Sequence, residues 1–259
     1  MIEFFTTLTG TTPPGTVALL ALVALVAGFS RGLTGFGAGM IFVPMASGFV
    51  GPMPAIGLIY VIDSPTIFAT ARGALLRAEK AKTGMLLAGW ALTTPLGLWL
   101  LAWLDPLTVR WLICLMILSA VSLLIGGWTY RGKPTLTLAF VTGLVAGITG
   151  GLTGLSGPPI VMLWLAAASA TAMNVRDNIN LFFLVTMFVY AVLFPMYGIL
   201  TWPVLRLGAL LALPYAAGFF AGTLVFRRMG ERNYRRSAYV VIGTAAVLAL
   251  PWMDRVLGR

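Results

Sequence analysis

Hydrophobic residues dominate the chain, and polar residues interrupt them only at short intervals. The apolar runs are long enough to cross a membrane as helices, which need about 20 residues each. We therefore predict an all-α polytopic membrane protein. The predicted spans are residues 54–77, 83–104 and 108–128 in the first half of the chain, and 178–199, 203–226 and 236–252 in the second.

Two further apolar stretches, residues 16–50 and 135–172, are each interrupted by a glycine-rich phrase. We expect residues 16–29 to form one arm of the first element, which ends at the phrase. Each arm has about 14 residues, or roughly 21 Å of helix, which is shorter than the hydrocarbon core of a membrane. We predict that each stretch forms a broken or re-entrant helical hairpin.

The two phrases are copies of each other. LVAGFSRGLTG begins at Leu25 and LVAGITGGLTG begins at Leu144, an offset of 119 residues, and eight of the eleven positions are identical. The offset persists downstream, where Pro95 matches Pro214. Such register indicates two structural repeats, which we place at residues 1–133 and 134–259.

Charge predicts the orientation of these repeats. Only 9% of the residues are charged, whereas a soluble domain has about 25%. The net charge of +10 comes mostly from the loops at residues 72–82, 131–133 and 227–236, which we expect to be cytoplasmic; nucleic-acid binding is not expected. Each half then has three spans and one hairpin, so the repeats are predicted to be inverted. We predict that the protein lies in the cytoplasmic membrane and that both of its termini are extracytoplasmic.

The residue inventory argues against an enzyme. The chain has no histidine and one cysteine, Cys114, and it lacks phosphate-binding, metalloprotease and nucleophile-elbow motifs. We predict no cofactor and no metal site. An oligomer is compatible with the sequence but is not predicted by it.

The two phrases are the candidate binding site. A helix broken at membrane depth exposes backbone N–H groups, and this is tolerated only where they line a cavity or meet a ligand. Two facing helix N-termini would attract a small anion, and Ser156 is a candidate N-cap. Alternatively, the glycines only let helices pack closely. The candidate residues in the phrases are Thr34, Gly35, Gly37, Thr153, Gly154, Ser156 and Gly157.

Three polar residues outside this backbone pattern are further candidates. Arg31 lies in the first break and could supply positive charge for an oxyanion, or it could extend to the membrane surface. Asp63 could release Arg31 when substrate arrives, could carry a proton, or could form a static ion pair with Arg31. Asn180 is a candidate cavity residue, whereas Asp177 or Asn178 could cap the span that follows.

The segments GFSRGLTGFGAGM and GITGGLTGLSGPPIV resemble the paired signature of the TauE/SafE family, also called the sulfite exporter or TSUP family. The resemblance covers nearly the whole chain. It implies transport of a small sulfur-containing anion, sulfite or an organosulfonate. From the inverted halves we expect a secondary transporter that works by alternating access, as one half rocks against the other. A passive anion channel with the same site, or a transporter of another small organic anion, are the alternatives. Asp63 lies outside the resembling segments, and protons are a candidate coupling ion.

Overall fold

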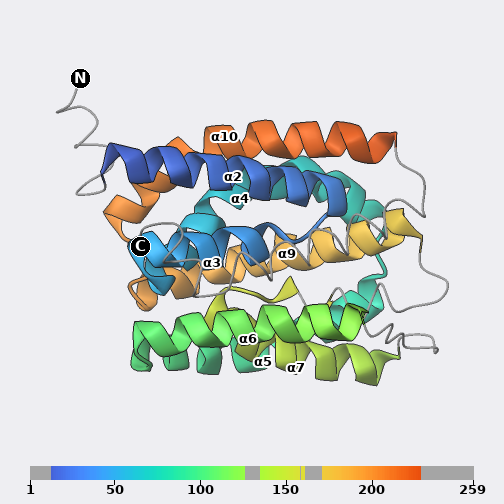
Figure 1. Ribbon diagram of the computed structural model, residues 1–259. Helices are drawn as coiled ribbons and strands as arrows, with labels where there is room; N and C mark the ends of the chain where they lie inside the picture. The colour runs from blue at the N-terminus through green and yellow to red at the C-terminus, as the bar shows by residue number, and fades with distance from the viewer. Residues whose placement is uncertain (1–12, 126–134, 158, 161–170, 229–259) are drawn as a thin grey trace.

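A computed structural model describes residues 13–125, 135–157, 159–160 and 171–228. The predicted span 236–252 and most of the second arm of the second broken element lie outside the described residues. Every element named for the described part of the chain is a helix (Figure 1), so the all-α prediction is confirmed. The helices are α2 (Pro14–Thr34), α3 (Ala38–Val50), α4 (Pro52–Arg77), α5 (Lys80–Trp103), α6 (Pro106–Ile125), α7 (Leu136–Thr153), α9 (Ala172–Met196) and α10 (Trp202–Arg227).

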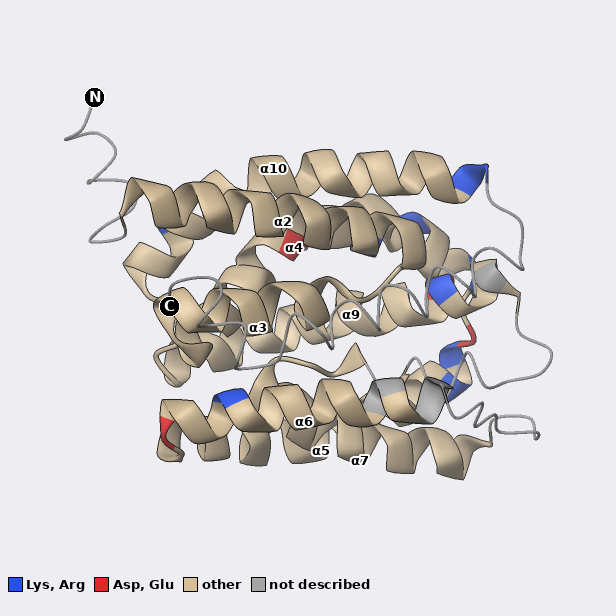
Figure 2. Cartoon of the chain, viewed as in Figure 1, with Lys and Arg blue, Asp and Glu red and all other residues tan. Residues whose placement is uncertain are grey.

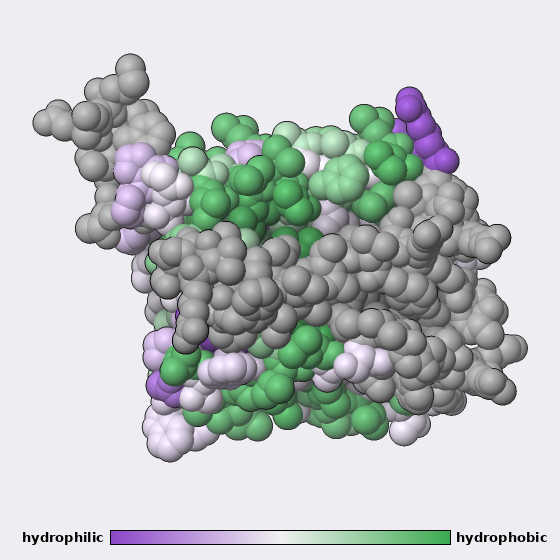
Figure 3. Space-filling model, in the orientation of Figure 1, coloured by the Kyte–Doolittle hydropathy of each residue, from purple (hydrophilic) through white to green (hydrophobic). Residues whose placement is uncertain are grey.

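Six of these helices are long and apolar enough to cross a membrane: α2, α4, α5, α7, α9 and α10. Their outward faces carry large hydrophobic side chains such as Trp103, Leu213 and Met196, which are each about three-quarters exposed. Hydrophobic residues therefore cover much of the visible outer surface of α2 and α10 (Figure 3). A protein in water would bury such side chains, so the exposed apolar surface is the one that lipid requires. The chain is a multi-pass membrane protein.

The first arms of the broken elements are longer than predicted. Helix α2 has 21 residues and continues through Arg31 to Thr34, and α7 continues to Thr153. The expectation that the first arm ends at residue 29 is therefore wrong, as is the expectation that this arm is too short to span. The glycines inside the phrases do not break the helix, because tight packing on a neighbouring helix stabilises it there. Among the arms that the structure describes in full, α3, with 13 residues, keeps the short length expected.

The start of α9 also differs from the prediction, since the helix begins at Ala172 and not at residue 178. The side chain of Thr171 accepts a hydrogen bond from the backbone N–H of Asn174 at 3.3 Å and is the N-cap. Asp177 and Asn178 therefore lie inside the helix, and the interpretation that either one caps it is wrong.

Glycines bring two pairs of helices into close contact. In the first pair, Gly28 and Gly32 of α2 face α10, and a Cβ atom on either would overlap a backbone carbonyl oxygen there. In the second pair, Gly89 of α5 and Gly143 of α7 contact the backbone of the partner helix in the same way. Small residues let helix backbones approach closely in membranes. The packing interpretation therefore holds for Gly28 and Gly32 of the first phrase.

Each of these two pairs combines one helix from the first half of the chain with one helix from the second half. Helix α2 of the first half packs on α10 of the second, and α7 of the second half packs on α5 of the first. Helices α2 and α7 end at Thr34 and Thr153, which are 119 residues apart, the offset of the sequence repeat. The division of the chain into two structural repeats stays a prediction. The inversion of the repeats across a membrane stays a prediction.

Basic residues gather at one end of the helices (Figure 2). This end combines the C-terminus of α4, the start of α5, the start of α9 and the C-terminus of α10. It carries Arg72, Arg77, Lys80, Lys82, Arg176, Arg227 and Arg228. Such an excess favours the cytoplasmic side, although the orientation of the chain and of its termini stays a prediction.

Candidate functional site

Each phrase ends its helix with a left-handed glycine. Gly35 has φ 85° and Gly154 has φ 71°, a conformation that side chains disfavour. The N–H of each glycine donates to the carbonyl oxygen four residues earlier, Arg31 in one case and Gly150 in the other, at 2.8 and 2.9 Å. The breaks are therefore short turns that follow complete helices.

The matched threonines stabilise these turns. The hydroxyl of Thr34 donates to the carbonyl of Ser30 at 2.9 Å, and that of Thr153 donates to the carbonyl of Thr149 at 2.7 Å. Each hydroxyl also accepts the N–H two residues later, at 3.3 Å. Both side chains are buried and neither lines the cavity described next. We therefore assign Thr34 and Thr153 to the structure of the turns.

The two turns meet at one cavity, which is lined mainly by residues of α3, α4 and α9 and of the second turn. A Cβ atom on Gly39 would lie 3.6 Å from the carbonyl oxygen of Gly154, which shows how closely the turns approach. The cavity has about 740 Å³ of empty volume, including its open side, and most of its lining is apolar. A mostly apolar lining with a few polar groups is typical of a small-molecule site. Six predicted site residues line it: Arg31, Gly37, Asp63, Gly154, Ser156 and Gly157.

Helix α3 begins at the cavity. Its N-cap residue, Gly37, has φ 89°, and no side chain caps the helix. Residues 37–40, which form the N-cap and the first turn, all line the cavity. The N–H groups of a first helical turn have no partner within their own helix, and the helix dipole places partial positive charge there. This end of α3 can therefore receive an anionic group.

Arg31 lies in the last turn of α2, and its side chain is only 2% exposed. Its Nε donates to both carboxylate oxygens of Asp63, at 3.3 and 3.2 Å, and its Nη1 donates to the side-chain oxygen of Asn180 at 3.0 Å. Nη1 also donates to the carbonyl of Gly35, and the guanidinium lies 4.7 Å from the centre of the Phe183 ring. Arg31 is therefore held inside the protein and does not extend to the membrane surface.

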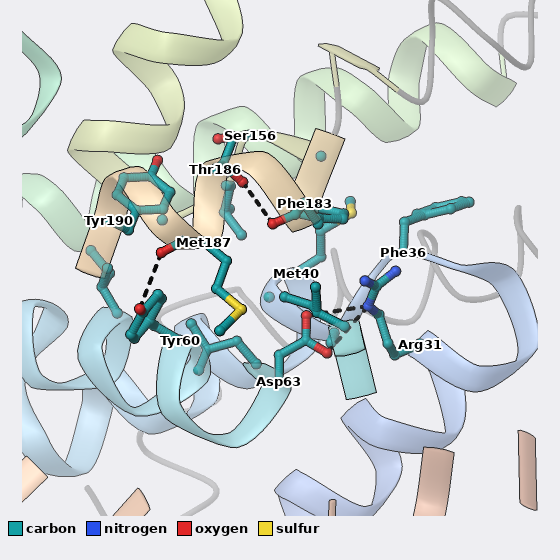
Figure 4. A pocket seen from close by; sticks show the side chains of 18 of the residues that line it. Arg31, Phe36, Met40, Tyr60, Asp63, Ser156, Phe183, Thr186, Met187 and Tyr190 are labelled. Atoms are coloured by element: carbon teal, nitrogen blue, oxygen red, sulfur yellow. Dashed lines mark hydrogen bonds and ion pairs between the residues drawn. The ribbon is translucent and has the colours of Figure 1, made fainter. Parts of the chain in front are cut away.

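The two carboxylate oxygens of Asp63 accept different numbers of hydrogen bonds. Oδ1 accepts from the hydroxyls of Thr66 and Tyr215, each at 2.6 Å, as well as from Arg31. Oδ2 accepts only from Arg31 within the described part of the chain. Figure 4 shows the carboxylate facing Arg31 at one end of the cavity, with Tyr60 and Tyr190 towards the other end. The predicted ion pair between Arg31 and Asp63 is present in the structure.

Four predicted residues do not line the cavity: Thr34, Gly35, Thr153 and Asn180. The Cα of Gly35 faces the side chain of Arg176, whose Cγ would be 2.7 Å from a Cβ on that glycine. Asn180 reaches the site only through Arg31. These residues position others and are separated from the cavity space.

Arg31 and Gly150 occupy matching positions in the two phrases, and the structure explains their difference. A Cβ atom on Gly150 would overlap the hydroxyl oxygen of Ser156, so the serine side chain takes the space that the glycine leaves. Ser156 itself lies directly before the helical residue Gly157. The site is therefore charged on the side of the first phrase and carries a neutral hydroxyl on the side of the second.

Sequence reasoning missed several polar residues of the site: Tyr60, Thr66, Thr186, Tyr190 and Tyr215. Tyr60 donates to the carbonyl of Met187 at 3.1 Å and so joins α4 to α9 across the cavity. Thr66 could have been found, because it lies three residues after Asp63 on the same helix and such residues are neighbours. Tyr215 is 152 residues from Asp63, and no local pattern indicates that contact.

A second ion pair joins α4 to α9 at the basic end of the molecule. Arg77 donates from Nε and Nη2 to the two carboxylate oxygens of Asp177, at 2.6 and 3.1 Å. Arg77 is half exposed, whereas the side chain of Asp177 is 4% exposed. Next to it, the side-chain oxygen of Asn178 accepts the backbone N–H of Glu79 at 2.7 Å. Both residues therefore connect helices, and neither belongs to the cavity.

Comparison with known proteins gives one match. The profile of the family described as "Sulfite exporter TauE/SafE" matches residues 20–249, which is most of the chain. Searches of curated proteins and of solved structures found no match.

Proposed function

Because this chain belongs to the TauE/SafE family of sulfite exporters, we propose that it is a secondary transporter for a small sulfur-containing anion. The proposed substrate is sulfite or an organosulfonate, and the proposed location is the cytoplasmic membrane, with both termini outside the cytoplasm.

The observation that supports a binding site is the meeting of the two turns with Arg31 at one cavity. The uncapped first turn of α3 supplies backbone N–H groups, and Arg31 supplies a planar fork of N–H donors. Both suit the oxygens of a sulfite or sulfonate group. In this proposal the substrate lies between the first turn of α3 and Ser156 and Gly157 of the second phrase.

The cavity walls favour a transporter that closes around its substrate. The lining is contributed by both repeats: α3 and α4 from the first, and the second turn and α9 from the second. The contact of Tyr60 with Met187 closes one part of the α4–α9 boundary, and the pair of Arg77 and Asp177 closes another. Alternating access would open these two contacts in turn, as one repeat rocks against the other.

Purified protein in detergent offers the first test. We expect sulfite and short alkanesulfonates to raise its thermal stability, because a ligand that binds the folded state stabilises it. Arg31→Ala should remove this effect. Flux into liposomes then separates the candidates: a transporter saturates and shows counterflow, whereas a channel shows neither. If no sulfur anion bound or moved, the proposal would be wrong.

A further inference from the structure

The described lining of the cavity contains one positive and one negative side chain, Arg31 and Asp63. The other described lining residues are neutral. The two charges are in direct contact at 3.2 Å and are largely removed from water, with exposed fractions of 2% and 13%. The empty site therefore has no net charge, although it is proposed to receive an anion.

An anion that entered this site alone would leave one uncompensated negative charge inside the membrane. Burying an unpaired charge is strongly unfavourable. The negative charge of Asp63, which lies beside Arg31, would also repel an anionic substrate that approached Arg31. The site therefore needs a second positive charge whenever it holds an anion.

The hydrogen bonds indicate where that charge can be added. Oδ1 of Asp63 already accepts from Thr66 and Tyr215, so it has little capacity for a proton. Oδ2 contacts Arg31 alone among the described residues. A proton on Oδ2 would remove the negative charge from Asp63 and leave Thr66 and Tyr215 in place. The N–H groups of Arg31 could then turn to the substrate.

The polar and charged groups on the helices around Asp63 are compatible with the addition of a proton to Oδ2. Helix α2 contributes Arg31, and α10 contributes Tyr215. Within α4 the nearest such groups are Thr66 and Tyr60, and α3 contributes only uncharged residues to the cavity. From α9, Asn180 contacts Arg31 and Tyr190 lines the cavity. No second carboxylate among the described lining residues competes for the proton.

We propose that the site takes up one monovalent anion together with one proton, which binds to Oδ2 of Asp63, so that transport is electroneutral. This inference rests on the proposed transport function and names its substrate class. A divalent anion would leave one negative charge unbalanced even after Asp63 is protonated. Monosulfonates and the monoanionic form of sulfite are therefore substrates, and disulfonates and the sulfite dianion are not.

The test uses the full-length protein in proteoliposomes, with methanesulfonate and ethane-1,2-disulfonate as matched probes. Radiolabelled uptake, the internal pH and the current on a supported membrane are measured together. We expect methanesulfonate to enter with one proton per anion and without current, and we expect no uptake of the disulfonate. In Asp63→Asn, methanesulfonate should still bind to Arg31, but its movement should produce a current and no internal acidification. Glu79→Gln removes an exposed carboxylate outside the cavity and should behave like the wild type.

The outcomes distinguish the two proposals. If the wild type moves no sulfonate or sulfite at all, the proposed function is wrong and this inference falls with it. If the wild type moves methanesulfonate with a net current, or moves the disulfonate equally well, only the inference is wrong. Wild-type currents and proton ratios decide this point even if Asp63→Asn does not fold.

Discussion

The side-chain oxygen of Asn180 accepts a hydrogen bond from Nη1 of Arg31 at 3.0 Å, although 149 positions separate the two residues along the chain. The bond connects the last turn of α2, in the first half of the chain, to α9, in the second half. The same guanidinium holds Asp63 on α4 through Nε. Arg31 is therefore held by α4 and α9 at once, and a movement of either helix would change its hydrogen bonds.

Asn180→Ala should weaken substrate binding without abolishing it. The substitution removes one bond to a charged donor, worth about 1.5–3 kcal/mol, and Nη1 keeps its bond to the carbonyl of Gly35. We expect the affinity for methanesulfonate to fall about tenfold or more in a binding titration. Asn174→Ala, an exposed change on the same helix, is the control. Equal affinities in the two variants would contradict a positioning role for Asn180.

Arg31 can be tested for substrate binding separately from ion pairing. Arg31→Met alone leaves Asp63 without its cation, and breaking a buried pair in this way costs about 3–5 kcal/mol. The double variant Arg31→Met with Asp63→Asn removes both charges, so we expect its thermal stability to recover. Its anion binding should remain absent. Recovery of wild-type affinity in the double variant would mean that Arg31 serves only the ion pair.

Replacing Gly154 and Gly157 by alanine should have different effects on the protein. Gly154 has φ 71°, and a Cβ atom there would lie 2.9 Å from Ile56, so Gly154→Ala should destabilise the protein by at least about 1–2 kcal/mol. Gly157 has no atom near its Cβ position and no such φ. Gly157→Ala should preserve the melting temperature and lower the affinity for substrate, because the new methyl group enters the cavity. Unchanged affinity would argue that the substrate does not approach Gly157.

Close packing of α5 on α7 predicts a contrast between two glycines of one helix. A Cβ atom on Gly89 would overlap the carbonyl oxygen of Phe140, whereas one on Gly84 meets nothing within 4 Å. Gly89→Ala should lower the stability in detergent by about 1–3 kcal/mol, the usual cost of overpacking. Gly84→Ala should be neutral or slightly stabilising, because alanine favours a helix. Similar unfolding curves for both variants would be inconsistent with this packing.

The pair of Arg77 and Asp177 should matter more than an exposed pair nearby. Arg77→Gln leaves a buried carboxylate with a poorer partner, which costs about 1–3 kcal/mol. Lys82→Gln breaks the exposed contact with Glu79, which is worth about 0–1 kcal/mol. Thermal unfolding monitored by tryptophan fluorescence compares the two variants directly. A larger loss of thermal stability for Lys82→Gln would contradict the conclusion that the ion pair of buried Asp177 with Arg77 stabilises the contact between α4 and α9.

Much of the architecture follows from local patterns in the chain. Apolar length predicted four of the six long apolar helices, α4, α5, α9 and α10, because a helix in lipid must satisfy its own backbone hydrogen bonds over the whole membrane thickness. Helices α2 and α7 were predicted only as short arms. The repeated phrase predicted matching interruptions, and the structure places left-handed glycines at Gly35 and Gly154. The helix ends were less predictable, since whether Gly28 and Gly32 break a helix or pack it depends on the neighbouring helix.

The sequence by itself determined that this protein is helical and membrane-spanning, that one phrase recurs at an offset of 119 residues, and that Arg31 and Asp63 are unusual charges within apolar segments. Only the tertiary structure decided that the two turns share one cavity, and that Tyr215 and Asn180 join the ion pair from distant helices. The physical reason is the range of the interactions. Backbone conformation and membrane insertion depend on residues close along the chain, whereas the partners of a buried charge depend on which helices pack together.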